Sequence, residues 1–137
     1  MVLVTVDDQP PGRTEQARRL ADRPAGWSDL VPELNRQPSN HVVTKRTRGA
    51  FASTDLEAYL RTRGVTQVVI VGISTSGGVE STARHAFDLG FNVTIATDAT
   101  TDMDAETHDR SVTCVFPKLG ETATARAVIA LLDEAGA

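Results

Sequence analysis

Cysteine, lysine and aromatic side chains are scarce in this sequence. One of its 137 residues is a cysteine, and aromatic residues make up 4%. A lone cysteine excludes a disulfide framework within the chain and a cysteine-rich metal site. No apolar run approaches the roughly 20 residues that a membrane helix needs. The first residues, MVLVTVDDQ, lack the basic region of a signal peptide, so we expect a cytoplasmic protein with no membrane partner.

An excess of positive charge is also missing. The chain carries 14 basic and 18 acidic residues, a net charge of −4, and its basic residues are dispersed along the sequence. Proteins that bind nucleic acid usually present a basic patch, so we expect no nucleic-acid partner. The length suits one domain with one core, which predicts a single domain over residues 1–137.

Short β-branched runs alternate with helical patterns along the chain. The runs are 2–6, 41–44, 67–72 and 92–97, and VVIVG lacks polar alternation, which is typical of a parallel strand buried on both faces. Apolar residues at helical spacing predict helices near 54–63, 79–89, 105–116 and 124–135. Strands alternating with helices predict the α/β class, as a three-layer αβα Rossmann-like parallel sheet with right-handed crossovers.

The stretch 7–27 departs from this pattern. It holds three prolines, two glycines and many charges, with few apolar residues. Polar connections of about 20 residues are uncommon in compact domains. We therefore predict a long polar loop, which is either a solvated connection or a lid or partner-binding segment.

The turn after the third strand is the richest candidate site. In parallel sheets, ligands bind where strand carboxyl ends lead into helix N-termini. Here the turn holds Ser74, Thr75, Gly77 and Gly78, and paired glycines allow a ligand to approach backbone N–H groups. The sequence is neither a Walker A loop nor a G-x-S-x-G elbow. A turn needed only for tight strand–helix packing is the alternative.

Lysine is the second candidate. The chain has 12 arginines but only two lysines, Lys45 and Lys118. Lys45 follows the strand HVVT and therefore lies at a carboxyl edge as well. A compact ammonium there can stabilise negative charge that develops on a substrate, although an exposed surface lysine would look the same in sequence.

Metal and thiol chemistry find little support in the sequence. His41, His85 and His108 have no metal-ligand spacing with other ligands, so we expect no metal and no cofactor. Cys114 falls in a predicted helix between apolar residues, and we expect an inert buried thiol.

The segment 42–112 resembles the isochorismatase-like hydrolase family, the superfamily that also holds nicotinamidases. The resemblance rests on VVTK, AFASTDL, VVIVGISTS, ESTARHA and DAETHD in that order, followed by GETATARAVIALL as the closing helix. It covers about two thirds of the chain. The resemblance implies a small-molecule substrate and a homo-oligomer.

Position by position, Lys45 matches the active-site lysine of that family. Gly78 falls where the nicotinamidase branch carries its nucleophilic cysteine, so the resemblance implies a non-covalent route, as in the isochorismatase branch. The bond Ile73–Ser74 matches a site where family members often have a non-proline cis peptide. The zinc-binding residues of some nicotinamidases have no counterpart in this sequence.

The family's Asp-x-Gln motif matches Asp7-Asp8-Gln9 in its letters only. Just 38 positions separate Asp7 from Lys45, where the family has a helix, another strand and a long loop. Residues 2–6 therefore correspond better to the family's second strand. We expect the first strand and helix, with the catalytic aspartate, to be missing from this chain, which leaves Asp7 as a weak candidate acid.

Three functions follow from these observations. The first is an isochorismatase-like hydrolase in which Lys45 stabilises charge, the 74–78 turn floors the pocket, and Phe51 and Trp27 form apolar walls. The second is an inactive family member that serves as a structural or interaction module. The third, a nucleotide- or phosphate-binding module, rests on the glycine turn alone. We favour an enzyme of the first kind.

Overall fold

A computed structural model describes residues 1–8, 10–15 and 23–136. Its strands are β1 (Val2–Val6), β2 (His41–Lys45), β3 (Gln67–Ile73), β4 (Asn92–Thr101) and β5 (Glu121–Ala123). Its α-helices are α1 (Leu56–Thr62), α2 (Glu80–Asp88), α3 (Ala105–Arg110) and α4 (Ala125–Gly136). None of the described helices is long and apolar enough to cross a membrane.

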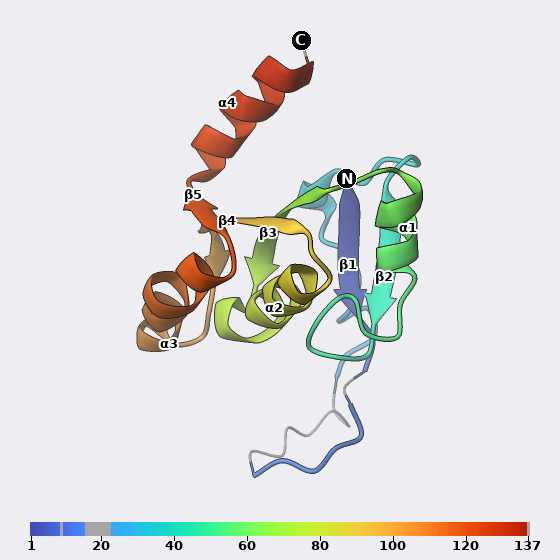
Figure 1. The fold of residues 1–137 in the computed structure, drawn as a ribbon. Coiled ribbons are helices and arrows are strands. Elements are labelled where there is room, and N and C mark those ends of the chain that lie inside the picture. The colour runs from blue at the N-terminus through green and yellow to red at the C-terminus, as the bar shows by residue number, and fades with distance from the viewer. Residues whose placement is uncertain (9, 16–22, 137) are drawn as a thin grey trace.

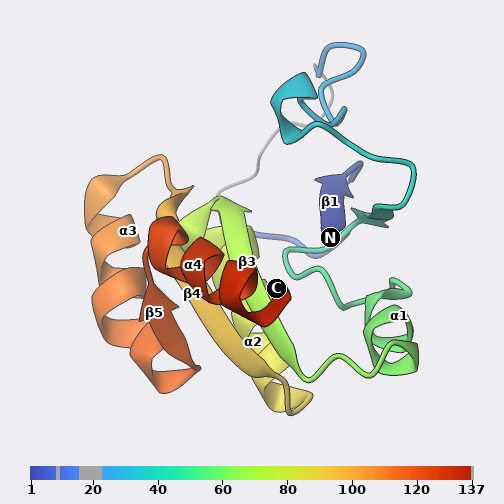
Figure 2. The ribbon, with the colours of Figure 1, turned by 90° about the horizontal axis from the view of Figure 1, so that it is seen from above.

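All strand pairs are parallel, and strands alternate with helices, which confirms the predicted α/β class. The strands form two separate ladders, β1–β2 and β3–β4–β5. β1 lies on the side of its ladder that faces β3, and both strands run in the same direction (Figures 1 and 2). The described structure thus has a split sheet, with one edge of β1 and one edge of β3 turned toward each other.

One hydrophobic core holds the two ladders together. It combines Val43 of β2, Leu60 of α1, Ala83 of α2 and Ile95 of β4 with Phe116, and all five are buried. Val2 of β1 and Ile70 of β3 pack against the same cluster. Because side chains from both ladders meet the same helices, neither ladder buries its apolar face without the other.

α4 follows β5 and extends away from the three-stranded ladder (Figure 1). Its Val128, Leu131 and Leu132 line a groove of about 700 Å³ with Val69 and Thr94. Val128 is buried, whereas Leu131 and Leu132 are 65% and 61% exposed. The apolar helix face predicted at 124–135 is therefore formed, but only part of it is covered.

Three expectations about burial are wrong. β3 is not buried on both faces, because Val69, Val71 and Ile73 are 41%, 55% and 77% exposed. The described residues place neither a strand at its free edge nor a helix over Val71 and Ile73. The apolar spacing of 79–89 predicts Phe87 on the buried face of its helix, yet Phe87 is half exposed. Cys114, predicted to be buried, is exposed on a π-helical turn, Ser111–Val115.

Several boundaries also moved. The helix expected at 79–89 is preceded by a π-helical turn, Thr75–Val79, and β4 continues four residues beyond its predicted end. The three-residue β5 was not predicted. The predicted loop 7–27 contains residues 9 and 16–22, which lie outside the described residues. The single domain over 1–137 stays a prediction.

Replacing Phe116 by alanine should lower the free energy of unfolding by about 3–5 kcal/mol. Its side chain is completely buried in the core that joins both ladders, so truncation leaves a cavity. Urea denaturation followed by circular dichroism measures the change. Ile129→Ala on the exposed side of α4 is the control and should shift the value by no more than about 0.5 kcal/mol. Equal effects of the two changes would contradict a shared core.

Candidate active site

Lys45 is the last residue of β2, and its side chain reaches the turn that follows β3. The Nζ atom donates a hydrogen bond to the carbonyl oxygen of Arg48. A Cβ atom built on Gly78 would lie 2.9 Å from this Nζ and 3.4 Å from the same carbonyl oxygen. The structure therefore brings together the two features that the sequence singled out, the lysine and the glycine turn.

Burial changes the acidity of this lysine. Lys45 is partly buried, and loss of hydration lowers the pKa of its ammonium group below the ordinary 10.5. A carbonyl oxygen satisfies one of its three N–H donors. The ammonium can therefore still donate to a ligand beside Gly78.

The turn itself, residues 74–79, starts with a cis peptide bond between Ile73 and Ser74, as the family resemblance implied. The N–H groups of Gly77 and Val79 both donate to the carbonyl oxygen of Ser74, at 3.1 Å each. Ser74 Oγ would lie 2.6 Å from a Cβ atom at Gly77, so its hydroxyl group covers that glycine. These N–H groups hold the turn together and are not open to a ligand.

Asp102 fixes the turn from the end of β4. Its Oδ2 accepts hydrogen bonds from the N–H and the hydroxyl of Ser76, at 2.7 and 2.6 Å. Its Oδ1 accepts one from the N–H of Met103 at 2.8 Å. The hydroxyl of Ser76, followed by its N–H, holds the pKa of the Asp102 carboxyl below its ordinary value.

Thr75 anchors the other side of the turn. Its side chain is completely buried, and its Oγ1 lies 2.7 Å from Nδ1 of His108 on α3. The turn is thus attached to β4 through Ser76 and to α3 through Thr75. Both attachments come from segments that follow it by about 30 residues.

Asp7 occupies the same edge but contacts a different cation. It follows β1, and its N–H donates to the carbonyl oxygen of Lys45 at 3.2 Å. Its carboxylate accepts two hydrogen bonds from Arg46, at 3.1 and 3.2 Å. The hydrogen bonds from Arg46 lower the pKa of Asp7 below its ordinary value. Asp7 therefore contacts Lys45 through the backbone only, and its carboxylate pairs with the side chain of Arg46.

The two predicted apolar walls lie in different surroundings. Phe51 is buried in the core, where its ring centre is 5.9 Å from that of Phe91 and 5.5 Å from that of His85. Trp27 is partly exposed, and the guanidinium of Arg23 lies 3.6 Å above its ring centre. Phe51 is therefore a core residue, and among the described residues no hydrogen bond or ring contact joins either ring to Lys45 or to the 74–78 turn.

Sequence reasoning missed Asp102 and the contact between His108 and Thr75. The carboxyl-edge rule that selected Lys45 would also have selected Asp102, had β4 been given its full length. His108 had no comparable signal, because only the packing of α3 brings its ring to Thr75.

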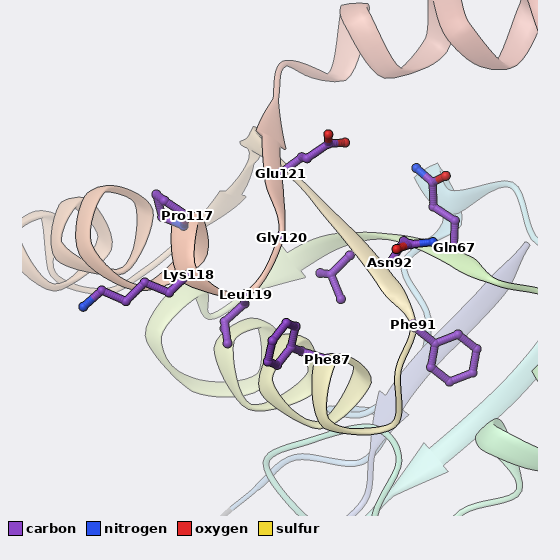
Figure 3. A pocket seen from close by; sticks show the side chains of 10 residues that line it. Gln67, Phe87, Phe91, Asn92, Pro117, Lys118, Leu119, Gly120 and Glu121 are labelled. Atoms are coloured by element: carbon purple, nitrogen blue, oxygen red, sulfur yellow. The ribbon is translucent and has the colours of Figure 1, made fainter.

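Two grooves on the described surface lie away from this turn. One groove of about 490 Å³ is lined by residues at the amino ends of strands, including Gln67, Asn92 and Glu121, and by Phe87 and Lys118 (Figure 3). The other lies under α4. Neither of these two grooves is lined by Lys45 or Gly78.

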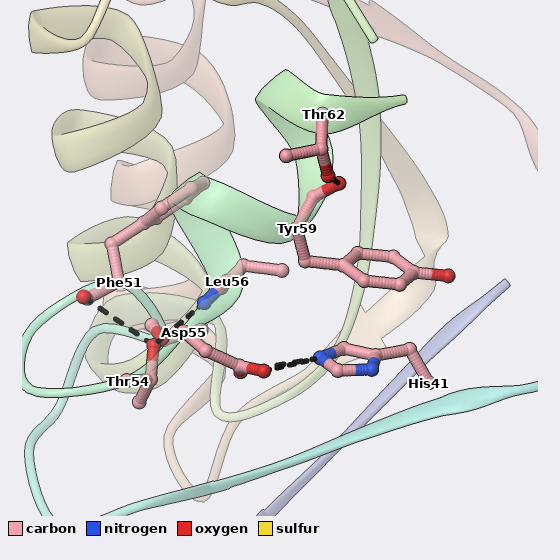
Figure 4. A network of polar contacts seen from close by, with 8 residues as sticks. His41, Phe51, Thr54, Asp55, Leu56, Tyr59 and Thr62 are labelled. Carbon is pink, nitrogen blue, oxygen red and sulfur yellow. Dashed lines mark hydrogen bonds and ion pairs between the residues drawn. The ribbon is translucent and has the colours of Figure 1, made fainter. Parts of the chain in front are cut away.

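The histidines lie apart and have separate roles. His41 stacks on Tyr59 with ring centres 3.8 Å apart and lies 3.1 Å from the carboxylate of Asp55 (Figure 4). His85 packs on Phe51. Among the described residues, no group of three or more His, Cys, Asp or Glu side chains could hold a metal ion.

The chain is a parallel α/β protein in which a lysine and a glycine turn meet at the carboxyl edge of the strands. The Isochorismatase domain family matches residues 2–127, so the chain is a member of the isochorismatase family.

Individual relatives agree with this assignment. The isochorismatase family protein YwoC of Bacillus subtilis is 44% identical over 103 residues, which are 75% of this chain and 54% of that protein. Nicotinamidase 3 of Arabidopsis thaliana is 36% identical over 62% of this chain and 44% of its own length. The solved structure of an isochorismatase family protein from Burkholderia thailandensis is 38% identical, with a TM-score of 0.86 over 91% of this chain and 69% of that one. The chain spans about half the length of the curated relatives it matches.

Replacing Asp102 by asparagine should weaken the acid dependence of stability. The pKa of Asp102 is lowered in the folded state, so its stabilising effect is complete above pH 3.8 and is lost as the pH falls through the lowered pKa. The unfolding free energy of the wild-type chain should therefore drop more steeply below pH 3.8 than that of the variant. Urea denaturation over a pH series measures both slopes.

The partner of this contact supplies the control. Ser76→Ala removes the hydroxyl that contributes most to the lowered pKa, so the double variant should lose little more stability than Asp102→Asn alone. Additive losses would show that Asp102 acts through other contacts.

Proposed function

We propose that this chain is a hydrolase of the isochorismatase family that acts on a small metabolite by a non-covalent acid/base route. The observation that carries the proposal is the contact between the two predicted features. Gly78 lies beside the Lys45 ammonium: a Cβ atom built on this glycine would be 2.9 Å from Nζ, so a side chain there would collide with the lysine. That arrangement offers a positive charge to a substrate but supplies no nucleophile at residue 78, because the lysine already occupies the place of a side chain.

Lys45 stabilises negative charge that develops on the substrate in this proposal. A partly desolvated ammonium is worth more to such a charge than a hydrated one, because fewer water molecules screen the attraction. Ser74, Thr75, Gly77 and Gly78 form the floor. Their own hydrogen bonds keep this floor rigid, so the ammonium has a fixed surface to work against.

The described residues beside Lys45 include no group well suited to donate a proton to the substrate. Asp7 is held ionised by Arg46, and a carboxyl group with a lowered pKa is a poor acid at neutral pH. It suits the role of a base or of an anchor for Arg46 better. We infer that the proton-donating group at this edge of the sheet comes from a part of the polypeptide that makes no described contact with Lys45.

The relatives support a hydrolase with a small-molecule substrate. Those that match include proteins named nicotinamidase and ureidoacrylate amidohydrolase, the latter from Variovorax paradoxus at 38% identity over 57% of this chain. We propose the same type of activity, hydrolysis, for this chain. A homo-oligomer, a cytoplasmic location and the absence of a nucleic-acid partner stay predictions.

The alternative is an inactive family member that serves as a structural or interaction module. The split sheet favours it, because unpaired strand edges are surfaces on which another polypeptide can pair. The two functions differ in one measurement. Hydrolysis of nicotinamide, ureidoacrylate or isochorismate above background supports the enzyme, and failure with every compound in the set supports the module.

Replacing Lys45 by methionine should lower kcat/KM by roughly 100-fold or more, because the charge that stabilises the transition state is removed. Steady-state assays with whichever compound is hydrolysed measure the effect. The wild-type rate should also fall as the pH rises through the lowered pKa of Lys45, below 10.5.

The second lysine of the chain is the matched control. Lys118 is exposed at the amino-end groove, so Lys118→Met should leave kcat/KM unchanged. If both variants lose activity to the same extent, Lys45 has no special role in the reaction.

A non-covalent route also predicts indifference to thiol reagents. Cys114 is the only cysteine and is exposed on the turn after α3, so iodoacetamide should modify it. Alkylation, and separately Cys114→Ser, should leave the hydrolysis rate within about twofold, because surface changes away from a site have small effects. Mass spectrometry confirms the modification. Loss of activity on alkylation would point to a thiol mechanism and contradict the proposal.

A further inference from the structure

The loop that follows β2, residues 46–55, lies against the turn and the helix that follow β3. A Cβ atom built on Gly49 would be 3.3 Å from the carbonyl oxygen of Ser81. A Cβ atom built on Gly78 would be 3.4 Å from the carbonyl oxygen of Arg48. Two glycines, one from each segment, therefore allow the two backbones to approach closely. The contact joins the two ladders at the edge that carries the candidate site.

One hydroxyl group bridges this contact. Oγ1 of Thr82, in the first turn of α2, accepts a hydrogen bond from the N–H of Ala50 at 3.0 Å. The same hydroxyl donates a hydrogen bond to the carbonyl oxygen of Gly78 at 2.7 Å. A hydroxyl group has one proton to donate and lone pairs that accept, so both bonds form at once. Thr82 thereby links the 46–55 loop to the glycine that lies beside Lys45.

The loop side of this link is buried and braced by its own hydrogen bonds. Ala50 is buried, so its N–H depends on a partner within the protein. The hydroxyl of Thr54 donates to the carbonyl oxygen of Ala50 at 2.6 Å. The hydroxyl of Thr47 donates to the carbonyl oxygen of Gly49 at 2.7 Å and so spans Arg48. Because the loop is held together in this way, a displacement of Ala50 also displaces Arg48.

The position of Arg48 in turn determines that of the lysine. The carbonyl oxygen of Arg48 accepts the hydrogen bond from Nζ of Lys45, so the loop decides whether the ammonium group stays beside Gly78. Burial at this place lowers the pKa of the Lys45 ammonium. A loop that moves away from Gly78 exposes the ammonium to water, which returns its pKa toward the ordinary 10.5.

We propose that Thr82 is a positioning residue of the candidate active site, whose hydroxyl group holds the 46–55 loop against Gly78 and thereby keeps the Lys45 ammonium beside the turn. Thr82 acts through the loop and not on the substrate. Groups that stabilise a transition state must be held within about 0.5 Å of their working position. The effect of Thr82 on the reaction rests on the proposed hydrolase function, whereas its effect on Lys45 exists with or without activity.

Thr82→Val tests this proposal, because it removes the hydroxyl group and keeps a side chain of similar size. The chain contains two lysines, Lys45 and Lys118, so NMR of protein made with isotope-labelled lysine gives one Cε signal for each, and Lys118→Met assigns them. A pH titration of the Lys45 signal measures its pKa. We expect the midpoint to rise toward 10.5 in Thr82→Val, because the ammonium gains water. With whichever compound is hydrolysed, kcat/KM should fall by roughly tenfold, because the charge is misplaced.

Two further variants separate positioning from a general effect on the helix. Thr82→Ser keeps the hydroxyl group and should restore the wild-type titration and most of the wild-type rate. Thr113→Val is the matched control, because the exposed Thr113 also donates to a carbonyl oxygen four residues earlier, that of Asp109 at 2.7 Å. It should titrate and react as the wild type does. Circular dichroism shows whether each variant is folded, and Thr82→Ala, which puts no methyl group in place of the hydroxyl, replaces Thr82→Val if that variant is not.

Several results would overturn the proposal. The Lys45 midpoint stays where it is in Thr82→Val, or Thr113→Val moves it equally, or Thr82→Ser fails to restore the wild-type values. A shifted midpoint with an unchanged kcat/KM would overturn it as well, since the hydroxyl would then hold the lysine without any effect on the reaction. If no compound is hydrolysed, the proposed function fails, while the titration still decides whether Thr82 positions Lys45.

Discussion

Burial of one apolar cluster beneath α1 and α2 is the interaction on which the rest of the structure depends. The two ladders share no hydrogen-bonded strand pair among the described residues, so their relative position rests on side chains such as Val43, Ile95 and Phe116. Packing of this kind is strong in sum but does not satisfy backbone groups at strand edges.

The candidate site depends on the same core indirectly, because the core positions the two ladders that carry its residues. Lys45 ends a strand of one ladder, and Gly78 follows a strand of the other, so the two lie side by side only because the shared core aligns both carboxyl ends. The hydrogen bonds of Asp102 and His108 then fix the turn locally.

Much of the architecture could be predicted because it rests on local signals. Continuous β-branched runs marked β1 to β4, and the carboxyl-edge rule placed Lys45 and the 74–78 turn at one edge. Predictions that needed knowledge of neighbours were less successful. The three residues of β5 have no pattern of their own, and the exposure of Val71 and Ile73 reflects what lies beside β3 rather than what β3 contains.

The sequence by itself determined the class of fold, the order of strands and helices, the family resemblance and the absence of a nucleophilic side chain at Gly78. Each of these depends on residue type and on spacing over a few turns or strands. Only the tertiary structure decided that Asp7 pairs with Arg46, that Asp102 holds Ser76, and that the sheet divides between β1 and β3. The physical reason is that the two hydrogen-bonded contacts join positions 39 and 26 residues apart, and no local pattern records which distant groups packing brings together.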